Sequence, residues 1–393
     1  MDAAEHVRPE LGEDEIRMIA AAADDVETVI TIAALSHSWR AVAVAQLSSN
    51  STLRPGSHAL QQLATGLKSK DPTFVTHVPL QSCIAVCESS LHRIVLISTL
   101  TGERIRTMGK FGWAPGPGLN YPKGIAADEA AEHLFVCDRS NHRVLKMQLS
   151  DGAILASCGH DAGARGNGER IFRYPQGLAY TRTKAYPSGV VFVCDYGNGR
   201  LVALDALDLS WGFSFGEQLA SDTDMPLPAG CVASATQVVV VDVSRHCLHA
   251  FSAVDGAHLR TLCTEGELEY PWGVCYLRAG DEHRLVIAEG AASGGRRGSL
   301  QVVCADSGRT LQVIEAPSAG RLSGVCAEAS SGARRIFVVD NDARCVRVLT
   351  SAWREEEEAG GQGSPRRSRA LPSVTRAGED GAAVTDTGFT ELT

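Results

Sequence analysis

Short apolar runs around a glycine recur along the middle of the chain. They read YPKGIAAD, YPQGLAYT, LPAGCVAS, YPWGVCYL and RLSGVCAE, with glycines Gly124, Gly177, Gly230, Gly273 and Gly324. A second apolar run follows each of them, such as FVCD or VVVVD, and ends in a carboxylate 12 to 18 residues after the glycine. One more such run, SCIAVCE, precedes the first glycine. Short apolar runs rich in β-branched residues are typical of buried strands, so the middle of the chain is predicted to contain six repeats. Their carboxylates are Glu88, Asp138, Asp195, Asp242, Glu289 and Asp340.

Each repeat continues with two more strand-like runs. A short polar turn after the carboxylate leads into a third run, for example HRVLKMQ, and turns such as SDG and VDG lead into a fourth. Four-stranded antiparallel sheets cannot bury both faces alone, whereas six of them stacked radially can. The fold class predicted from the repeats is therefore mainly β, a six-bladed β-propeller.

The last repeat lacks its fourth run, because the chain after Trp353 becomes acidic and glycine-rich. SHALQQLATG at residues 57–66 has the same pattern as AHLRTLCTEG at residues 257–266, a fourth run. We therefore expect residues 57–66 to complete the sixth blade and to close the ring.

The second repeat carries a recognisable motif. YPKGIA followed by FVCDRSNHRV resembles the pattern of the NHL-repeat propellers, and the likeness covers roughly residues 58–350. The fourth and fifth repeats depart from it, since Cys247 replaces the arginine of the motif and AASGGRRG is inserted in the fifth. The resemblance implies a ring with a binding face. Some members bind single-stranded RNA there, and tripartite-motif members connect the propeller to ubiquitin transfer through a RING domain, whose Cys/His spacing is missing here.

The repeated polar residues have an architectural interpretation. Arg93, Arg143 and Arg200 each follow a carboxylate by five residues, and we expect them to pair with a carboxylate of the same or the next blade. Most of the 12 cysteines lie in strand-like runs, so we expect buried free thiols. The chain has no CxxC zinc pattern and its histidines are scattered over different blade positions. The sequence therefore predicts no metal site, no catalytic residue and no cofactor.

The turns between second and third strands should share one face with the crossovers between blades, which carry Tyr121, Tyr174 and Tyr270. Loops on a rigid scaffold commonly carry recognition, and arginine and tyrosine are frequent in binding hot spots. The predicted partner-binding rim consists of Arg139, Asn141, His142, Tyr196, Asn198, Arg245, Arg296, Arg297 and Arg344.

Apolar residues before the ring recur at three- and four-residue steps, which predicts two or three short amphipathic helices. LGEDEIRMI followed by DDVETVITIAALSHSWRAVA is similar to the F-box pattern, although Gly12 stands where that family usually has proline. The resemblance implies binding to a Skp-type adaptor and a cullin, and the alternative is a plain helical cap on the propeller. The residues predicted to contact the adaptor are Leu11, Ile16, Ile19, Leu35 and Trp39.

Three regions follow from these patterns: an F-box-like helical module with its linker at 1–56, the propeller at 57–350, and a disordered tail at 351–393. The chain has 37 basic and 46 acidic residues and a net charge of −9, so a polycation that binds nucleic-acid phosphates is disfavoured. The sequence offers no apolar segment long enough to span a membrane and no signal-like start, so we expect a cytoplasmic or nuclear protein.

Together these features predict a non-catalytic scaffold that binds a protein substrate on the rim, as a substrate-recognition subunit of a cullin-type ubiquitin ligase. Two alternatives stay open. One is a propeller enzyme of the lyase or lactonase kind that uses the central channel, and the other is an RNA-binding propeller.

Overall fold

The computed structural model confirms the propeller. The described residues are 61–64, 67–69, 71–159, 168–217, 226–263, 267–277, 284–290, 298–315, 319–328 and 335–350. The predicted helical module, its adaptor-binding residues Leu11, Ile16, Ile19, Leu35 and Trp39, and the predicted tail lie outside this part of the chain, so they stay predictions.

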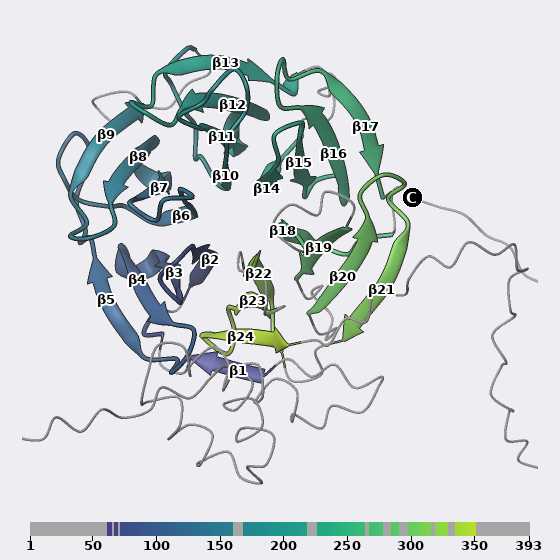
Figure 1. Ribbon diagram of the computed structural model, residues 1–393, viewed down its shortest axis with the longest axis horizontal. Helices are drawn as coiled ribbons and strands as arrows, with labels where there is room; N and C mark the ends of the chain where they lie inside the picture. The colour runs from purple at the N-terminus through teal and green to yellow at the C-terminus, as the bar shows by residue number, and fades with distance from the viewer. Residues whose placement is uncertain are drawn as a thin grey trace, which may run out of the picture. The chain divides into compact units, whose positions relative to one another are not determined.

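Six four-stranded antiparallel sheets surround one axis, as blades 1 to 6 (Figure 1). Blade 1 contains β2 (Pro72–Val78), β3 (Cys83–Glu88), β4 (Arg93–Ser98) and β5 (Arg104–Met108). Blade 2 contains β6 (Pro122–Ala127), β7 (His133–Asp138), β8 (Arg143–Gln148) and β9 (Ile154–Gly159). Blade 3 contains β10 (Leu178–Thr181), β11 (Val190–Asp195), β12 (Arg200–Asp205) and β13 (Trp211–Phe215).

The other three blades repeat this order from the axis outward. Blade 4 contains β14 (Pro228–Ala233), β15 (Gln237–Asp242), β16 (Cys247–Ser252) and β17 (His258–Leu262). Blade 5 contains β18 (Pro271–Tyr276), β19 (Arg284–Glu289), β20 (Ser299–Cys304) and β21 (Thr310–Glu315). Blade 6 contains β22 (Leu322–Ala327), β23 (Arg335–Asp340), β24 (Cys345–Thr350) and β1 (Gln61–Ala64).

The closure of the ring by an upstream strand is confirmed. β1 pairs antiparallel with β24, with Gln61 opposite Val348 and Ala64 opposite Val346. Residues from the two ends of the repeat region thus share blade 6, and the sheet does not end at an open β24 edge.

The helical part of the predicted fold class finds no support, because the described residues contain no α-helix. They contain three single-turn 3-10 helices, η1 (Ser89–Leu91), η2 (Arg139–Asn141) and η3 (Tyr196–Asn198), directly after the second strands of blades 1 to 3. None of the helices in this part of the chain is long and apolar enough to cross a membrane.

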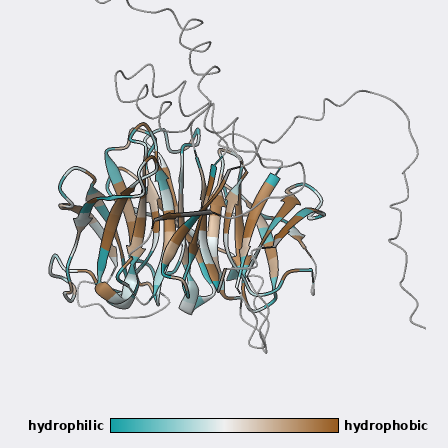
Figure 2. Ribbon diagram, turned by 90° about the horizontal axis from the view of Figure 1, so that it is seen from below, coloured by the Kyte–Doolittle hydropathy of each residue, from teal (hydrophilic) through white to brown (hydrophobic). Residues whose placement is uncertain are grey.

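The core lies between neighbouring blades, which explains the uninterrupted apolar runs. All six residues of β3 are buried, because neighbouring blades cover both faces of the inner strands, whereas the first four residues of the outer strand β5 are exposed. Leu96 of blade 1 and Leu145 of blade 2 belong to one such cluster. Seen edge-on, the strands are mostly hydrophobic and many turns are hydrophilic (Figure 2).

The repeated glycines let the innermost strands approach one another. A Cβ on Gly124 would stand 2.5 Å from the carbonyl oxygen of Gln176 and 2.8 Å from the Cα of Gly177 in the next blade. The corresponding contact of Gly324 is with Phe74 of blade 1, 2.5 Å from its Cα. Phe74 thus occupies in blade 1 the position that glycine has in the other blades. The residues just before the repeated glycines and Phe74 surround the axis.

Candidate functional site

As the sequence predicted, the turns after the second strands lie against the crossovers that enter the same blades. The amide of Ser140 donates to the carbonyl of Asn120 at 2.9 Å, and the amide of Gly290 donates to that of Tyr270 at 2.9 Å. We call this the turn face of the ring.

The carboxylate that ends each second strand anchors this face from inside. Asp138 is fully buried and accepts bonds from the amide of Asn120 (2.6 Å), the side chain of Asn141 (2.7 Å) and Nε of Arg143 (2.8 Å). Arg143 also donates to the carbonyl of Gly118 at 2.7 Å. Burial raises the pKa of Asp138, although these donors act against the rise. The predicted pairing of Arg143 is confirmed. Asn141, predicted to bind a partner, is buried against Asp138, and its contact with a partner stays a prediction.

His142, also predicted to bind a partner, makes a contact between two blades. Its ring is buried, and its Nδ1 accepts the backbone N–H of Tyr174 at 3.1 Å, across the junction of blades 2 and 3. His92 accepts the N–H of Tyr121 at 3.1 Å in the same way between blades 1 and 2. Both histidines have left-handed backbone angles, φ 55° and 54°, which turn their side chains toward the next blade. These two histidines therefore join neighbouring blades. The partner-binding role of His142 stays a prediction.

The other predicted rim residues differ in accessibility. Arg139 is half-buried, donates to Gln176 at 3.1 Å and lies 4.8 Å above the ring of Tyr174. Arg344 is exposed.

Tyr196 and Asn198 of blade 3 are half-buried, and the side-chain amide of Asn198 donates to Asp195 at 2.7 Å. Arg245 is half-buried 3.4 Å from Asp242. Arg296 and Arg297 lie outside the described residues.

An exposed aromatic cluster on the turn face was missed by the sequence reasoning. Trp113 is 66% exposed, Phe111 52% and Tyr121 41%. The ring centroids of Phe111 and Trp113 are 5.6 Å apart, and His92 contacts Phe111 and Tyr121, each at 4.8 Å. We call these four residues the aromatic patch. The segment KFGWAPGPGLNY could have revealed this patch, because two large aromatic side chains stand there in a Gly/Pro-rich loop that forms no strand.

A cavity of about 370 Å³ opens at the innermost strands of blades 1, 2, 5 and 6. Lys123, Trp272 and Ser323, the residues just before the repeated glycines, line it. Lys123 Nζ pairs with Asp71 at 2.9 Å, and burial lowers the pKa of Lys123 although Asp71 opposes this. The full lining is Asp71, Thr73, Lys123, Tyr270, Trp272, Gly290, Arg321, Leu322, Ser323 and Asn341.

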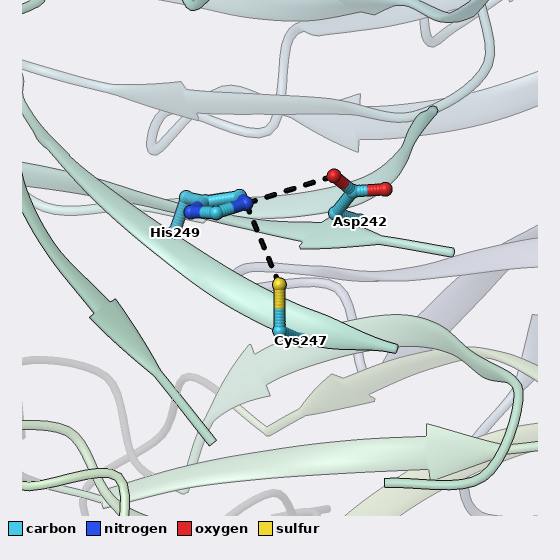
Figure 3. Close-up of side chains that lie close together, drawn as sticks. All are labelled: Asp242, Cys247 and His249. Atoms are coloured by element: carbon cyan, nitrogen blue, oxygen red, sulfur yellow. Dashed lines mark hydrogen bonds and ion pairs between the residues drawn. The ribbon is translucent and has the colours of Figure 1, made fainter. Parts of the chain in front are cut away.

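Blade 4 brings together three buried side chains that the sequence reasoning left apart (Figure 3). Nε2 of His249 lies 3.4 Å from Sγ of Cys247 and 3.6 Å from Oδ2 of Asp242. Burial raises the pKa of Asp242, but hydrogen bonds from His249 and Ser244 outweigh burial and hold it well below its ordinary value. The spacing D-x4-C-x-H could have revealed this cluster. Cys247 and His249 are two residues apart on one strand, so their side chains share a face.

The cysteines are free and mostly buried, as the sequence predicted. All 12 cysteines are free; ten are buried, and Cys304 and Cys326 are half-buried. Burial raises the pKa of Cys83 to about 11, so this thiol stays protonated and unreactive at neutral pH.

Comparisons with known proteins identify one repeat of the chain. The NHL-repeat family model matches residues 119–147, which span β6 to β8. No curated protein matches the chain. Similar solved structures include hydrazine synthase of Kuenenia stuttgartiensis, at 17% identity and a TM-score of 0.43, with 58% of this chain and 57% of that chain covered.

A nidogen/laminin complex is similar at 17% identity and a TM-score of 0.39, with 50% of this chain and 65% of that chain covered. The chain spans less than two thirds of either of these structures. The matched repeat and the six sheets around one axis carry the assignment: this chain is a six-bladed β-propeller with an NHL repeat in blade 2.

Proposed function

We propose that the chain is a non-catalytic scaffold that binds a protein partner on the turn face, with the aromatic patch as the central contact. The observation that carries this proposal is the exposure of Phe111, Trp113 and Tyr121 side by side. Contiguous exposed aromatic rings are unfavourable in water and are a frequent feature of interaction sites.

The cavity at the inner strands extends the same surface. Tyr121 of the patch is separated from Lys123 of the cavity by one residue of the chain. A partner that covers the patch with apolar side chains therefore has a polar anchoring point nearby, where the Lys123–Asp71 pair and Ser323 offer hydrogen bonds. Recognition with an apolar centre and a polar margin is common in protein interfaces.

The narrower role is a proposal that rests on the sequence pattern. In it the propeller selects the substrate of a cullin-type ubiquitin ligase in the cytoplasm or nucleus, and Leu11, Ile16, Ile19, Leu35 and Trp39 hold a Skp-type adaptor.

The docking surface is tested by capture from native lysate with the full chain. The variant Phe111→Ala/Trp113→Ala should lose the partner, while its melting temperature stays close to that of the native chain, because exposed substitutions change stability by only about ±0.5 kcal/mol. The matched control is Leu155→Ala/Leu259→Ala, which removes exposed apolar side chains from the outer strands β9 and β17. Equal recovery of the same partner by both variants would reject the aromatic patch as the docking site.

The adaptor role has its own test. Ile19→Ala/Trp39→Ala should lose the adaptor and cullin but keep the partner of the turn face. If the unaltered chain recovers no adaptor, the ubiquitin-ligase role is wrong, whereas the scaffold proposal is unaffected.

A further inference from the structure

Blade 4 differs from the other blades in what faces its buried carboxylate. In blade 6 the position opposite Asp340 is Cys345, and Arg347, two residues later on β24, donates to Asp340 at 2.7 Å. In blade 4 the same two positions hold Cys247 and His249. Two potential metal ligands thus stand where blade 6 has a thiol and a permanent cation.

Blade 5 also lacks an arginine here, but its chemistry is different. Glu289 accepts hydrogen bonds from the hydroxyl of Ser299 at 2.6 Å and from the side-chain amide of Gln301 at 3.0 Å. Both partners are good hydrogen-bond donors and poor zinc ligands, so they complete the carboxylate's hydrogen bonding.

The three side chains of blade 4 converge on one point and do not form a relay. In a nucleophile–histidine–carboxylate triad the two ring nitrogens of histidine face different partners. Here one nitrogen, Nε2 of His249, faces both Cys247 and Asp242 (Figure 3). The other, Nδ1, lies 3.0 Å from Oγ1 of Thr261, an outer contact of the kind that orients a metal-binding histidine.

The separations fit a tetrahedral zinc ion. Bonds of about 2.3 Å to sulfur and about 2.0 Å to nitrogen or oxygen put S and N about 3.5 Å apart and N and O about 3.3 Å apart in a tetrahedron. The corresponding separations are 3.4 Å for Cys247–His249 and 3.6 Å for Asp242–His249. All three ligand atoms lie within 4.8 Å of one another.

The carboxylate has one oxygen available for the ion. Oδ1 of Asp242 accepts the amide of Leu227 and both the amide and hydroxyl of Ser244, which fix the carboxylate plane. Oδ2 faces His249 and the guanidinium of Arg245, 3.4 Å away. The Arg245 side chain is 25% exposed, so it can turn toward water when a cation binds.

We propose that Asp242, Cys247 and His249 bind one Zn²⁺ ion inside blade 4, between β15 and β16. Binding forms a Zn–S bond and releases the thiol proton of Cys247 to solvent, while Asp242 binds as carboxylate and His249 as neutral imidazole. A cavity of about 10 Å³, lined partly by Asp242 and His249, offers the fourth position. It has room for roughly one water molecule. The ion cross-links the two middle strands of the blade and shares no residue with the aromatic patch.

The test uses the full chain, stripped with a chelator and titrated with Co²⁺ as a spectroscopic probe and with Zn²⁺ as competitor. We expect one tightly bound equivalent of Co²⁺ with the absorption of a tetrahedral ion and a thiolate-to-metal charge-transfer band, and its displacement by Zn²⁺. Zn²⁺ should also raise the melting temperature of the stripped chain.

Three variants decide the assignment. His249→Arg copies the arrangement of blade 6, so it should fold with its carboxylate paired, bind no Co²⁺ tightly and lose the stabilisation by Zn²⁺. Cys345→Ser changes the thiol at the same position of blade 6, so it should bind Co²⁺ like the native chain. The proposal is overturned if His249→Arg retains the tight equivalent, or if Cys247→Ser leaves the charge-transfer band unchanged.

Discussion

The internal arginine of blade 2 should be among the most important single side chains for stability. Arg143 has a side chain only 5% exposed, and it donates to Asp138 at 2.8 Å and to the carbonyls of Gly116 and Gly118 at 2.9 and 2.7 Å. Arg143→Met keeps much of the apolar stem, but the buried carboxylate of Asp138 loses its cation and the carbonyls of Gly116 and Gly118 lose this donor. Removing one partner of a buried pair costs about 3–5 kcal/mol.

Arg93 provides an internal comparison. It occupies the same position of blade 1 and pairs with Glu88, but its side chain is 22% exposed. Water can therefore replace part of the lost interaction, and Arg93→Met should cost clearly less than Arg143→Met. The free energy of unfolding, measured by urea titration with tryptophan fluorescence, gives both values.

The charge on Asp138 adds a pH dependence with a defined sign. Burial raises its pKa, so the folded chain keeps the proton to a higher pH than the unfolded chain, and its contribution to stability falls as pH rises above about 4. Loss of Arg143 raises this pKa further. The defect of Arg143→Met should therefore be larger at pH 8 than at pH 5.

A double-mutant cycle with Asp138→Asn completes the test. Because the neutral amide no longer needs a cation, the double variant should be more stable than the sum of the two single losses predicts, with a coupling of about 0.5–3 kcal/mol. Additive losses, or equal losses for Arg143→Met and Arg93→Met, would refute the buried-pair reasoning.

Three further outcomes follow from the ring. Deleting residues 1–50 should leave a cooperatively unfolding propeller, whereas deleting 1–68 removes β1, exposes the β24 edge and should cause aggregation in light scattering. Gly124→Ala should cost about 1–3 kcal/mol in urea unfolding, because its Cβ meets the backbone at Gln176. Burial lowers the pKa of His77, so the unfolded chain takes up the proton first and stability should fall as pH drops below about 6.5, less steeply in His77→Gln by melting temperature.

The sequence predicted the strands well because the propeller imposes strong local constraints. Inner strands are covered on both faces and read as unbroken apolar runs, and the second strands end at the predicted carboxylates, for example β7 at Asp138 and β23 at Asp340. Strand β1 lies before the repeats in the sequence, yet its segment SHALQQLATG has the residue pattern of an outer strand such as β17. These features depend on residues near in sequence, so a single repeat contains their signal.

The roles of the turn residues could not be predicted in the same way. Asn141 and His142 lie in a polar turn, and polar turns are usually exposed. The left-handed backbone at His142 aims its ring at Tyr174 of the next blade, while Asn141 points back to Asp138. Their burial depends on contacts between blades, which the spacing of one motif does not contain.

Variation among equivalent positions separates scaffold from function in this ring. Every blade keeps a buried carboxylate at the end of its second strand, so that residue reflects the fold. The side chain opposite this carboxylate and the loop that covers it both change between blades. Blade 4 has a thiol and an imidazole opposite its carboxylate, and the loop before blade 2 carries Phe111, Trp113 and Tyr121 of the aromatic patch. Because the two features lie in different blades and use no common residue, loss of metal binding in His249→Arg should leave partner capture intact. Loss of the patch should likewise leave cobalt binding intact. A variant that lost both would indicate a fold defect and would support neither assignment.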